Sequence, residues 1–270
     1  MAGRTDLEQI TREGDGSFVA IWGVHRLCSA FQPLFVFQGG RLKIIGYEGL
    51  LRPFRGAQTI GPGLFFSSLP EEDRFQVENL TRNLHLMNAG RSLDDKGDVF
   101  VNFDPSLFVD CALVDPALVR MRAVLAEAGI DPERVVCEIT EQKARSEPML
   151  GWFVEALRQN GYRVAVDDYG VEDSDMHRIL SLRPDIVKFD AQWLRALMCS
   201  KSGSDLLFEM VRRFTGMGIH TVFEGLEESW QVEVAERAGV SMVQGFALAR
   251  PALAPADFSA FGQRYEGHGG

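Results

Sequence analysis

Two adjacent carboxylates end an apolar stretch in the middle of the chain. Residues 163–170 begin with small and β-branched side chains, typical of a buried strand, and then run through Asp167 and Asp168 to a glycine, typical of a strand entering a loop. Two ionised carboxylates ~4 Å apart repel by roughly 1 kcal/mol in water and by about 4 kcal/mol at an effective dielectric of ~20. The pair is therefore either a solvated turn in which one Asp caps the next helix, or part of a site that holds a cation.

Polar side chains also stand at the ends of six other expected strands. They are Glu48, Asn102, Glu138, Lys188, Glu224 and Gln244. Each has a simple explanation by itself: Glu48 could form a surface ion pair, Asn102 could cap a helix, and Lys188 could be a solvated strand end. Taken together with Asp167 and Asp168, they exceed what capping explains.

The chemistry that fits this set is metal-dependent. Five carboxylates that face one another stay ionised only if cations accompany them, and hard oxygen ligands suit Mg²⁺ or Mn²⁺. A carboxylate that bridges two ions ~3.5–4 Å apart is typical of two-metal hydrolases that act on phosphate esters. The set therefore indicates a phosphoesterase site.

Strands and helices alternate along most of the chain, which would bring these strand ends together. Strands are expected at 99–103, 135–140, 164–168, 186–189, 221–224 and 242–248, with helices near 116–128, 147–160, 174–182, 203–217 and 228–238. This alternation predicts βα units and a parallel sheet. With two earlier strands it fits a closed (β/α)8 barrel, whose carboxyl strand ends share one face. An open doubly wound sheet is the alternative, although no glycine-rich nucleotide loop follows a strand.

The first part of the chain has a different pattern. We expect a polar N-terminal arm or helix over residues 1–16 and one barrel domain over 17–265. Apolar residues at helical spacing predict a helix over 18–30. Strands at 30–37 and 42–51, joined by a turn at Gln38–Arg41, predict an antiparallel hairpin. A loop at 54–70 and a helix at 71–88 are expected to follow.

Composition narrows the class of protein. Hydrophobic residues make up 46% of the chain, enough for a sizeable core, and no apolar run approaches the ~20 residues of a membrane span. The four cysteines are scattered, which favours a reducing, cytoplasmic location over a disulfide framework. A net charge of -10 disfavours DNA as a partner.

Seven short segments, in order, resemble motifs of the EAL domain family of cyclic di-GMP phosphodiesterases. The naming motif, Glu-x-Leu-x-Arg, matches Glu48–Arg52, with Gly49 where the family usually has Ala. The other matching segments are Phe31–Leu34, Glu138–Glu141, Asp167–Gly170, Lys188–Asp190, Phe223–Glu227 and Gln244–Phe246, the last followed by Pro251. The resemblance covers residues 30–251 and implies a modified TIM (β/α)8 barrel with the first strand antiparallel, which agrees with the expected hairpin.

The resemblance also implies two metal ions. One Mg²⁺ or Mn²⁺ ion would be held by Glu48, Asn102, Glu138 and Asp167. Asp167 would bridge to a second ion, held also by Asp168 and Glu224. The reaction would be hydrolysis of one phosphodiester bond of cyclic di-GMP to linear pGpG.

Further roles follow by position from the same resemblance. The catalytic residues would be Glu48, Lys188 and Glu141. Lys188 would orient or help to deprotonate the attacking water, and Glu141 would brace the loop after Asp168. The substrate would contact Gln32, Leu51, Arg52 and Gln244.

One loop departs from the family pattern. After Asp167–Gly170 the family usually has a glycine and small polar residues, whereas this chain has Val171–Asp175 with Glu172 in place of the glycine. In the family this loop links the metal site to a dimer interface, so a homodimer is left open. A catalytically silent receptor for cyclic di-GMP that acts through a protein partner, and a scaffold with a vestigial pocket, are the alternatives to an active enzyme.

Overall fold

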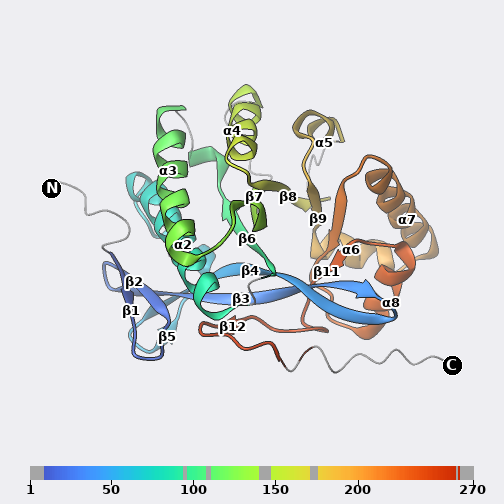
Figure 1. Cartoon of the computed structure of the whole chain (residues 1–270). Helices are drawn as coiled ribbons and strands as arrows, with labels where there is room; N and C mark the ends of the chain where they lie inside the picture. The colour runs from blue at the N-terminus through green and yellow to red at the C-terminus, as the bar shows by residue number, and fades with distance from the viewer. Residues whose placement is uncertain are drawn as a thin grey trace.

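A long antiparallel hairpin organises the first part of the chain. The computed structural model describes residues 9–93, 96–107, 111–139, 147–170, 176–259 and 261. β3 (His25–Gln38) pairs along its length with β4 (Arg41–Arg55), with one irregularity in the register at Leu34/Phe35. Figure 1 shows this hairpin crossing the whole molecule. The predicted hairpin is therefore confirmed, with both strands longer than expected.

The helix expected over residues 18–30 is wrong. β2 (Phe18–Trp22) pairs with β3 through a tight turn at Gly23, whose φ of +57° suits glycine. Apolar residues three apart satisfied the helical spacing, yet Ile21 and Val24 are 52% and 67% exposed instead of lying on a buried face. Before β2, β1 (Ile10–Arg12) adds an antiparallel strand.

Eight strands of the described chain close into a barrel. In order around it they are β3, β4, β6 (Asp98–Phe103), β7 (Val135–Ile139), β8 (Arg163–Tyr169), β9 (Ile186–Phe189), β10 (His220–Phe223) and β11 (Met242–Val243). β3 runs antiparallel to both of its neighbours, β4 and β11, and the other pairs are parallel. The predicted TIM-like barrel with its first strand antiparallel is confirmed.

Helices surround this barrel on the outside, as Figure 1 shows. They are α1 (Pro62–Ser67), α2 (Glu71–Ser92), α3 (Cys111–Ala128), α4 (Glu147–Gln159), α5 (Met176–Leu182), α6 (Ala191–Met198), α7 (Lys201–Gly216) and α8 (Ser229–Ala238). Outward-facing strand residues such as Val101 and Val164 pack under them in one large apolar core. The short strands β5 (Gln58–Thr59) and β12 (Ala252–Leu253) pair antiparallel with β4 and β3, respectively.

Two helices were not expected. The stretch 54–70, predicted as a loop, contains α1, which starts with a proline in its first turn. α6 follows β9 directly, because the Asp190 side chain caps it by accepting the N–H of Trp193.

The barrel interior holds an apolar layer with one side chain from each of seven strands. They are Leu34, Phe100, Val136, Ala165, Ile186, Val222 and Met242. The eighth strand, β4, contributes Gly46, where a Cβ would lie 3.0 Å from the ring of Phe100. This layer fills the lumen and is the floor on which the candidate site rests.

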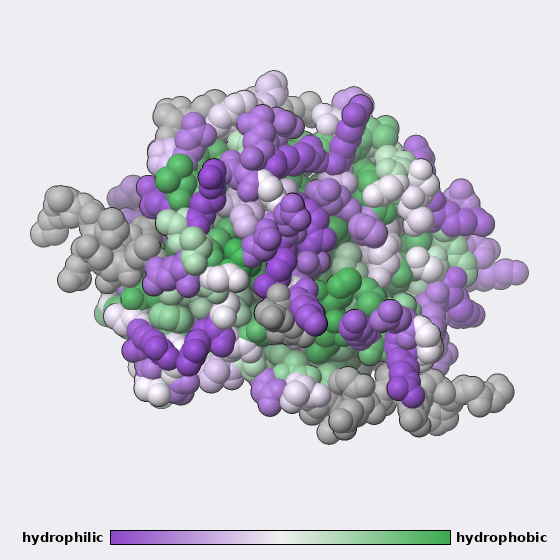
Figure 2. Space-filling model, viewed as in Figure 1, coloured by the Kyte–Doolittle hydropathy of each residue, from purple (hydrophilic) through white to green (hydrophobic). Residues whose placement is uncertain are grey.

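The outer surface is mixed in character. Figure 2 shows hydrophilic residues over much of one face, with exposed hydrophobic residues between them. Scattered exposed apolar residues are normal for a folded domain. None of the helices in the described part of the chain has the length and apolar character needed to cross a bilayer.

The contact between α2 and α3 gives a stability prediction. A Cβ on Gly90 would lie 2.1 Å from the carbonyl oxygen of Ala128, so Gly90→Ala must push the two helices apart and should lower the free energy of unfolding by about 1–3 kcal/mol. Gly151, within α4, has open space around it, so Gly151→Ala should raise that free energy by about 0.5–1 kcal/mol. Urea denaturation of both variants tests this, and equal effects would contradict the helix contact.

Candidate active site

The candidate site is the second layer of the barrel interior. In a strand, residues two apart point to the same side. Seven of the predicted strand-end residues, all except Asp168, stand two positions beyond the residue that their strand places in the first layer, toward the carboxyl ends of the parallel strands. This second layer consists of Glu48, Asn102, Glu138, Asp167, Lys188, Glu224 and Gln244, with Gln32 from the antiparallel β3 paired to Glu48.

Lys188 lies at the centre of this layer and is 1% exposed. Its Nζ is 2.5 Å from Oε1 of both Glu138 and Glu224. The same atom is 3.4 Å from Asp167 Oδ1 and 3.9 Å from Glu48 Oε1. One ammonium therefore faces four carboxylates from four different strands.

The electrostatics of these groups are dominated by burial and mutual repulsion. Burial alone would lower the pKa of Lys188, but the surrounding carboxylates, led by Asp167, raise it well above its usual value. Burial raises the pKa of Glu138 and of Glu224 well above the ordinary range, against the opposing effect of Lys188. The four carboxylates thus favour the charged form of Lys188, while burial opposes it.

The carboxylate pair at the end of β8 is strained. Asp168 has a φ of +56°, in the left-handed region that side chains other than glycine rarely adopt. Its backbone N–H donates to Asp167 Oδ1 at 2.9 Å. Burial, followed by the charge of Asp167, raises the pKa of Asp168 to about 6. Such a conformation persists where the surroundings enforce it, and it clusters at functional sites.

The donor set fits a hard divalent cation. Oε2 of Glu138 is buried with no hydrogen-bond partner among the described residues, which is costly for a carboxylate oxygen unless a cation faces it. One ammonium cannot neutralise four carboxylates, so all four would ionise only if a further cation joined them, as the raised pKa values of Glu138 and Glu224 indicate. The described His, Cys, Asp and Glu side chains form no ready-made group of three or more around a common ion position, and Glu138 and Glu224 face Lys188 instead.

The predicted substrate residues lie around this layer with different exposure. Gln244 Nε2 donates to Glu48 Oε2 at 2.8 Å, and Gln32 Nε2 donates to the carbonyl of Ala249 at 3.1 Å. Arg52 is half-buried and donates to the carbonyl of Leu51. The Leu51 side chain itself is buried in an outer apolar cluster.

Two predicted features lie outside the described residues. Glu141, expected to brace the loop after Asp168, is one of them. The loop Val171–Asp175, whose sequence differs from the family pattern, is the other.

Behind β4 and β6, α2 carries buried charged residues that the sequence analysis did not select. The Arg82 guanidinium stacks 3.4 Å from the centre of the Phe103 ring, and its Nε donates to the carbonyl of Asn102 at 3.3 Å. Glu78 Oε1 accepts the backbone N–H of Asp104 at 3.2 Å. Glu78 and Arg82 therefore bracket the end of β6. Glu78 and Arg82 are four residues apart and His85 follows three residues later, so the sequence does contain a polar stripe at helical spacing.

His85 also explains the glycine at position 49. A Cβ on Gly49 would lie 3.0 Å from both Cβ and Cγ of His85. His85 is buried, shares a hydrogen bond of 2.8 Å with Ser29 Oγ and packs its ring edge-on to Phe31. Burial lowers its pKa to about 3, so the imidazole is neutral. The ring cannot move aside easily, and glycine is the residue that fits.

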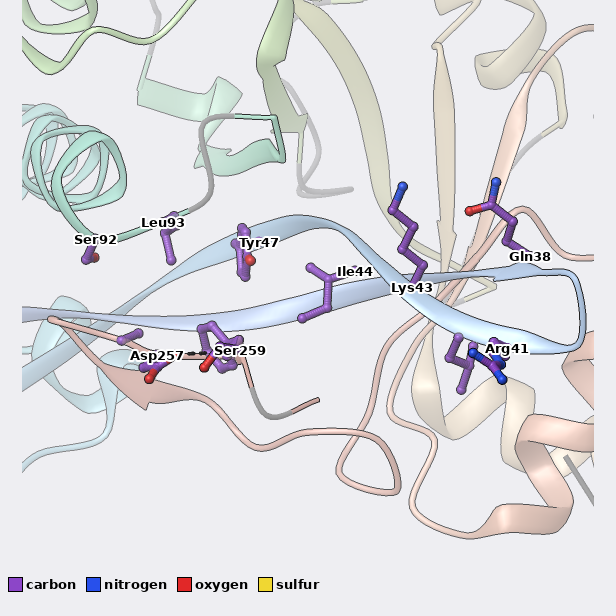
Figure 3. Close-up of a pocket in the computed structure, with 12 residues that line it drawn as sticks. Gln38, Arg41, Lys43, Ile44, Tyr47, Ser92, Leu93, Asp257 and Ser259 are labelled. Carbon is purple, nitrogen blue, oxygen red and sulfur yellow. Dashed lines mark hydrogen bonds between the residues drawn. The ribbon is translucent and has the colours of Figure 1, made fainter. Parts of the chain in front are cut away.

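Two cavities differ in their relation to this site. One of about 160 Å³ adjoins it and is lined by Leu51, Arg52 and Asn102 among others. A larger one, of about 540 Å³, lies at the other end of the barrel beside the tip of the β3–β4 hairpin. Figure 3 shows Gln38, Arg41 and Lys43 there, with Asp257 and Ser259 across from the hairpin. It contains none of the predicted site residues, so size does not identify the active site here.

Comparisons with known proteins agree with this geometry. A sequence model of the EAL domain matches residues 22–251. The chain is 29% identical over 80% of its length to the uncharacterized EAL-domain protein YkuI of Bacillus subtilis, of which it covers 53%. It is 26% identical over 82% of its length to the cyclic di-GMP phosphodiesterase RocR of Pseudomonas aeruginosa, of which it covers 56%. The chain thus spans about half the length of these relatives.

A solved structure supports the same assignment. The crystal structure of YkuI in complex with cyclic di-GMP and calcium superposes with a TM-score of 0.76 at 26% identity, covering 88% of this chain and 59% of that one.

The tight fit between Gly49 and His85 predicts a coupling between these two residues. Gly49→Ala should lower the free energy of unfolding by about 1–3 kcal/mol, because the new methyl group presses on a ring that is held in place. In a His85→Ala background the same change should cost much less. A double-mutant cycle measured by denaturant unfolding tests this. An equal cost in both backgrounds would show that another neighbour excludes the side chain.

Proposed function

The chain belongs to the EAL domain family, and from this premise we propose that it hydrolyses one phosphodiester bond of cyclic di-GMP, giving linear pGpG, with two divalent ions of Mg²⁺ or Mn²⁺. The observation that carries the proposal is the ring of strand-end carboxylates around Lys188, with no member of the predicted ligand set replaced. The named activity of RocR and the nucleotide bound to YkuI support it.

The residues of the ring divide into two ligand sets. Glu48, Asn102, Glu138 and Asp167 would hold one ion. Asp167, Asp168 and Glu224 would hold the other. The ions, when bound, would polarise the phosphodiester and lower the pKa of the attacking water.

Lys188 and the rim residues would act directly on substrate and water. The Lys188 ammonium would donate a hydrogen bond to the oxygen of the attacking water. This would keep a lone pair of the water directed at phosphorus. Arg52 would contact a phosphate or base of the substrate, since its guanidinium has several N–H donors beyond the one given to Leu51. Gln244 would keep Glu48 in position through their hydrogen bond. Glu141 would brace the loop after Asp168.

A silent receptor for cyclic di-GMP is the second candidate function. It is favoured by one sequence observation, the replacement of the family's loop glycine by Glu172. A receptor would bind the intact nucleotide through the same pocket and pass the signal to a protein partner. Turnover separates the two candidates.

We expect purified protein with Mg²⁺, and then with Mn²⁺, to convert cyclic di-GMP into pGpG. Glu48→Gln should lower turnover by at least about 100-fold, because it removes a ligand charge while keeping the side-chain shape. Separation of the two nucleotides by chromatography measures the rate. Binding of intact nucleotide without any pGpG would replace the enzyme by the receptor, and Glu172→Gly would then be the first reversion to test.

Metal binding should also stabilise the fold without any turnover. At about 100 times its dissociation constant an ion adds roughly 2.7 kcal/mol, which corresponds to a rise in Tm of about 5–10 °C for a domain of this size. Glu138→Gln should reduce this rise, since it neutralises a buried carboxylate with an unpartnered oxygen. Scanning calorimetry with Mn²⁺ and with EDTA provides the test. The same rise in both proteins would remove Glu138 from the ligand set.

A further inference from the structure

The two adjacent carboxylates at the end of β8 occupy an irregularity in its pairing with β9. The register shifts between Val166 and Tyr169. Within this shift, Asp167 and Asp168 together oppose a single residue of β9, Lys188. Two residues against one is the count of a β-bulge, which redirects side chains and is common beside active sites. Because the left-handed conformation of Asp168 persists only where its surroundings enforce it, the neighbours of this bulge decide where the carboxylate lies.

The first turn of α6 lies against the residues that follow the bulge. A Cβ on Gly170 would lie 2.4 Å from Cδ2 of the Trp193 ring, so this ring touches the Gly170 backbone. The same ring stacks on Phe189 with 5.9 Å between ring centres, and it meets the Tyr169 ring edge-on at 6.1 Å. Trp193 therefore leaves no room for the end of β8 to shift toward α6.

The same turn also contacts the end of β10. A Cβ on Gly225 would lie 2.3 Å from the Cβ of Ala191, the first residue of α6. Gly225 directly follows Glu224 and has a φ of +60°. One helical turn thus contacts the chain just after Asp168 and just after Glu224.

This turn is itself held in a fixed position. The Asp190 side chain accepts the backbone N–H of Trp193 at 2.8 Å. The Asp190 backbone N–H donates to the carbonyl of Tyr169 at 3.0 Å. Tyr169 in turn packs edge-on against Phe214 of α7 at 5.4 Å, inside the apolar core. The start of α6 is therefore a rigid support, joined by hydrogen bonds and ring contacts to the strand end that it touches.

We propose that Ala191 and Trp193 are positioning residues, which fix the Asp168 and Glu224 carboxylates at the separation that the second metal ion requires. The inference rests on the proposed function in so far as these two carboxylates are the ligands that the second ion does not share with the first. Groups that orient a metal ligand without touching the ion control the affinity of the site. The unshared ligands of the first ion come from β4, β6 and β7, whereas this turn contacts the ends of β8 and β10. The contacts therefore predict an effect on one ion and not on both.

The test is a titration of the purified protein with Mn²⁺ in the absence of nucleotide, with free Mn²⁺ measured by electron paramagnetic resonance. Trp193→Leu removes the ring from Gly170 and frees the end of β8. It should weaken the binding of one of the two ions by about tenfold or more and leave the other unchanged. Asp168→Asn, which removes a ligand charge of the second ion, should weaken the same ion. In the double variant the effect of Trp193→Leu should largely disappear, because both changes act through one carboxylate.

Three further variants separate positioning from general damage. Trp193→Phe keeps an aromatic ring over Gly170 and should restore most of the affinity that Trp193→Leu loses. Trp152→Leu makes the same change at an exposed site on α4 and should leave both dissociation constants unchanged. Ala191→Gly removes the methyl group against Gly225 and should weaken the same ion, which keeps the test available if Trp193→Leu does not fold.

Each outcome decides between the positioning role and the proposed function. Unchanged affinities in Trp193→Leu and Ala191→Gly, or an equal loss for both ions, overturn the positioning role and leave the proposed function intact. Two ions on the unaltered protein, with the expected loss in the variants but without turnover of cyclic di-GMP, uphold the positioning role and overturn the proposed hydrolysis. Fewer than two ions on the unaltered protein overturn the two ligand sets and the positioning role together.

Discussion

The arrangement of side chains at the carboxyl ends of the barrel strands depends on the burial of one ammonium group, that of Lys188. Taking the Lys188 charge out of water costs several kcal/mol, and the close contacts with Glu138 and Glu224 offset this cost. The carboxylates in turn remain ionised only beside a cation. Because one lysine cannot neutralise the four carboxylates around it, a divalent ion would allow all of them to ionise. The strands must therefore place their polar side chains around Lys188.

The barrel satisfies that requirement through the two-residue period of its strands. The polar second layer lies directly beyond the apolar layer that contains Phe100. The strand register that packs the apolar layer therefore also directs the polar side chains into the barrel. A slip of one residue in any strand would bury its polar side chain under the outer helices. The apolar layer also excludes water from the amino-terminal side of the site, which strengthens the electrostatic interactions among the polar side chains. The strand register that packs the apolar layer is therefore the same register that places the site residues.

Much of this was predictable because the pattern is local. Apolar runs that end in acidic, amide or basic residues mark both the strands and the site, and the confirmed barrel follows from their alternation with helices. The prediction of a helix over 18–30 failed because β2 and the start of β3, on either side of Gly23, place apolar residues at the same spacing as a helix. The polar stripe of α2 was missed because its meaning lies in distant contacts, such as that of Arg82 with Phe103. Spacing along one helix does not show which strand it covers.

The contact of α2 with β4 explains one of the two departures from the family pattern. Gly49 stands inside the naming motif, yet its cause is steric, because His85 occupies the space of a methyl group. The His85 ring is neutral and directed to Ser29, so this replacement alters packing and not the charge of the site. Glu172 adds a carboxylate close in sequence to Asp167 and Asp168, where one lysine already faces four carboxylates. The departure that bears on the proposed catalysis is therefore the loop acid, and the motif glycine is an adaptation of β4 to the helix behind it.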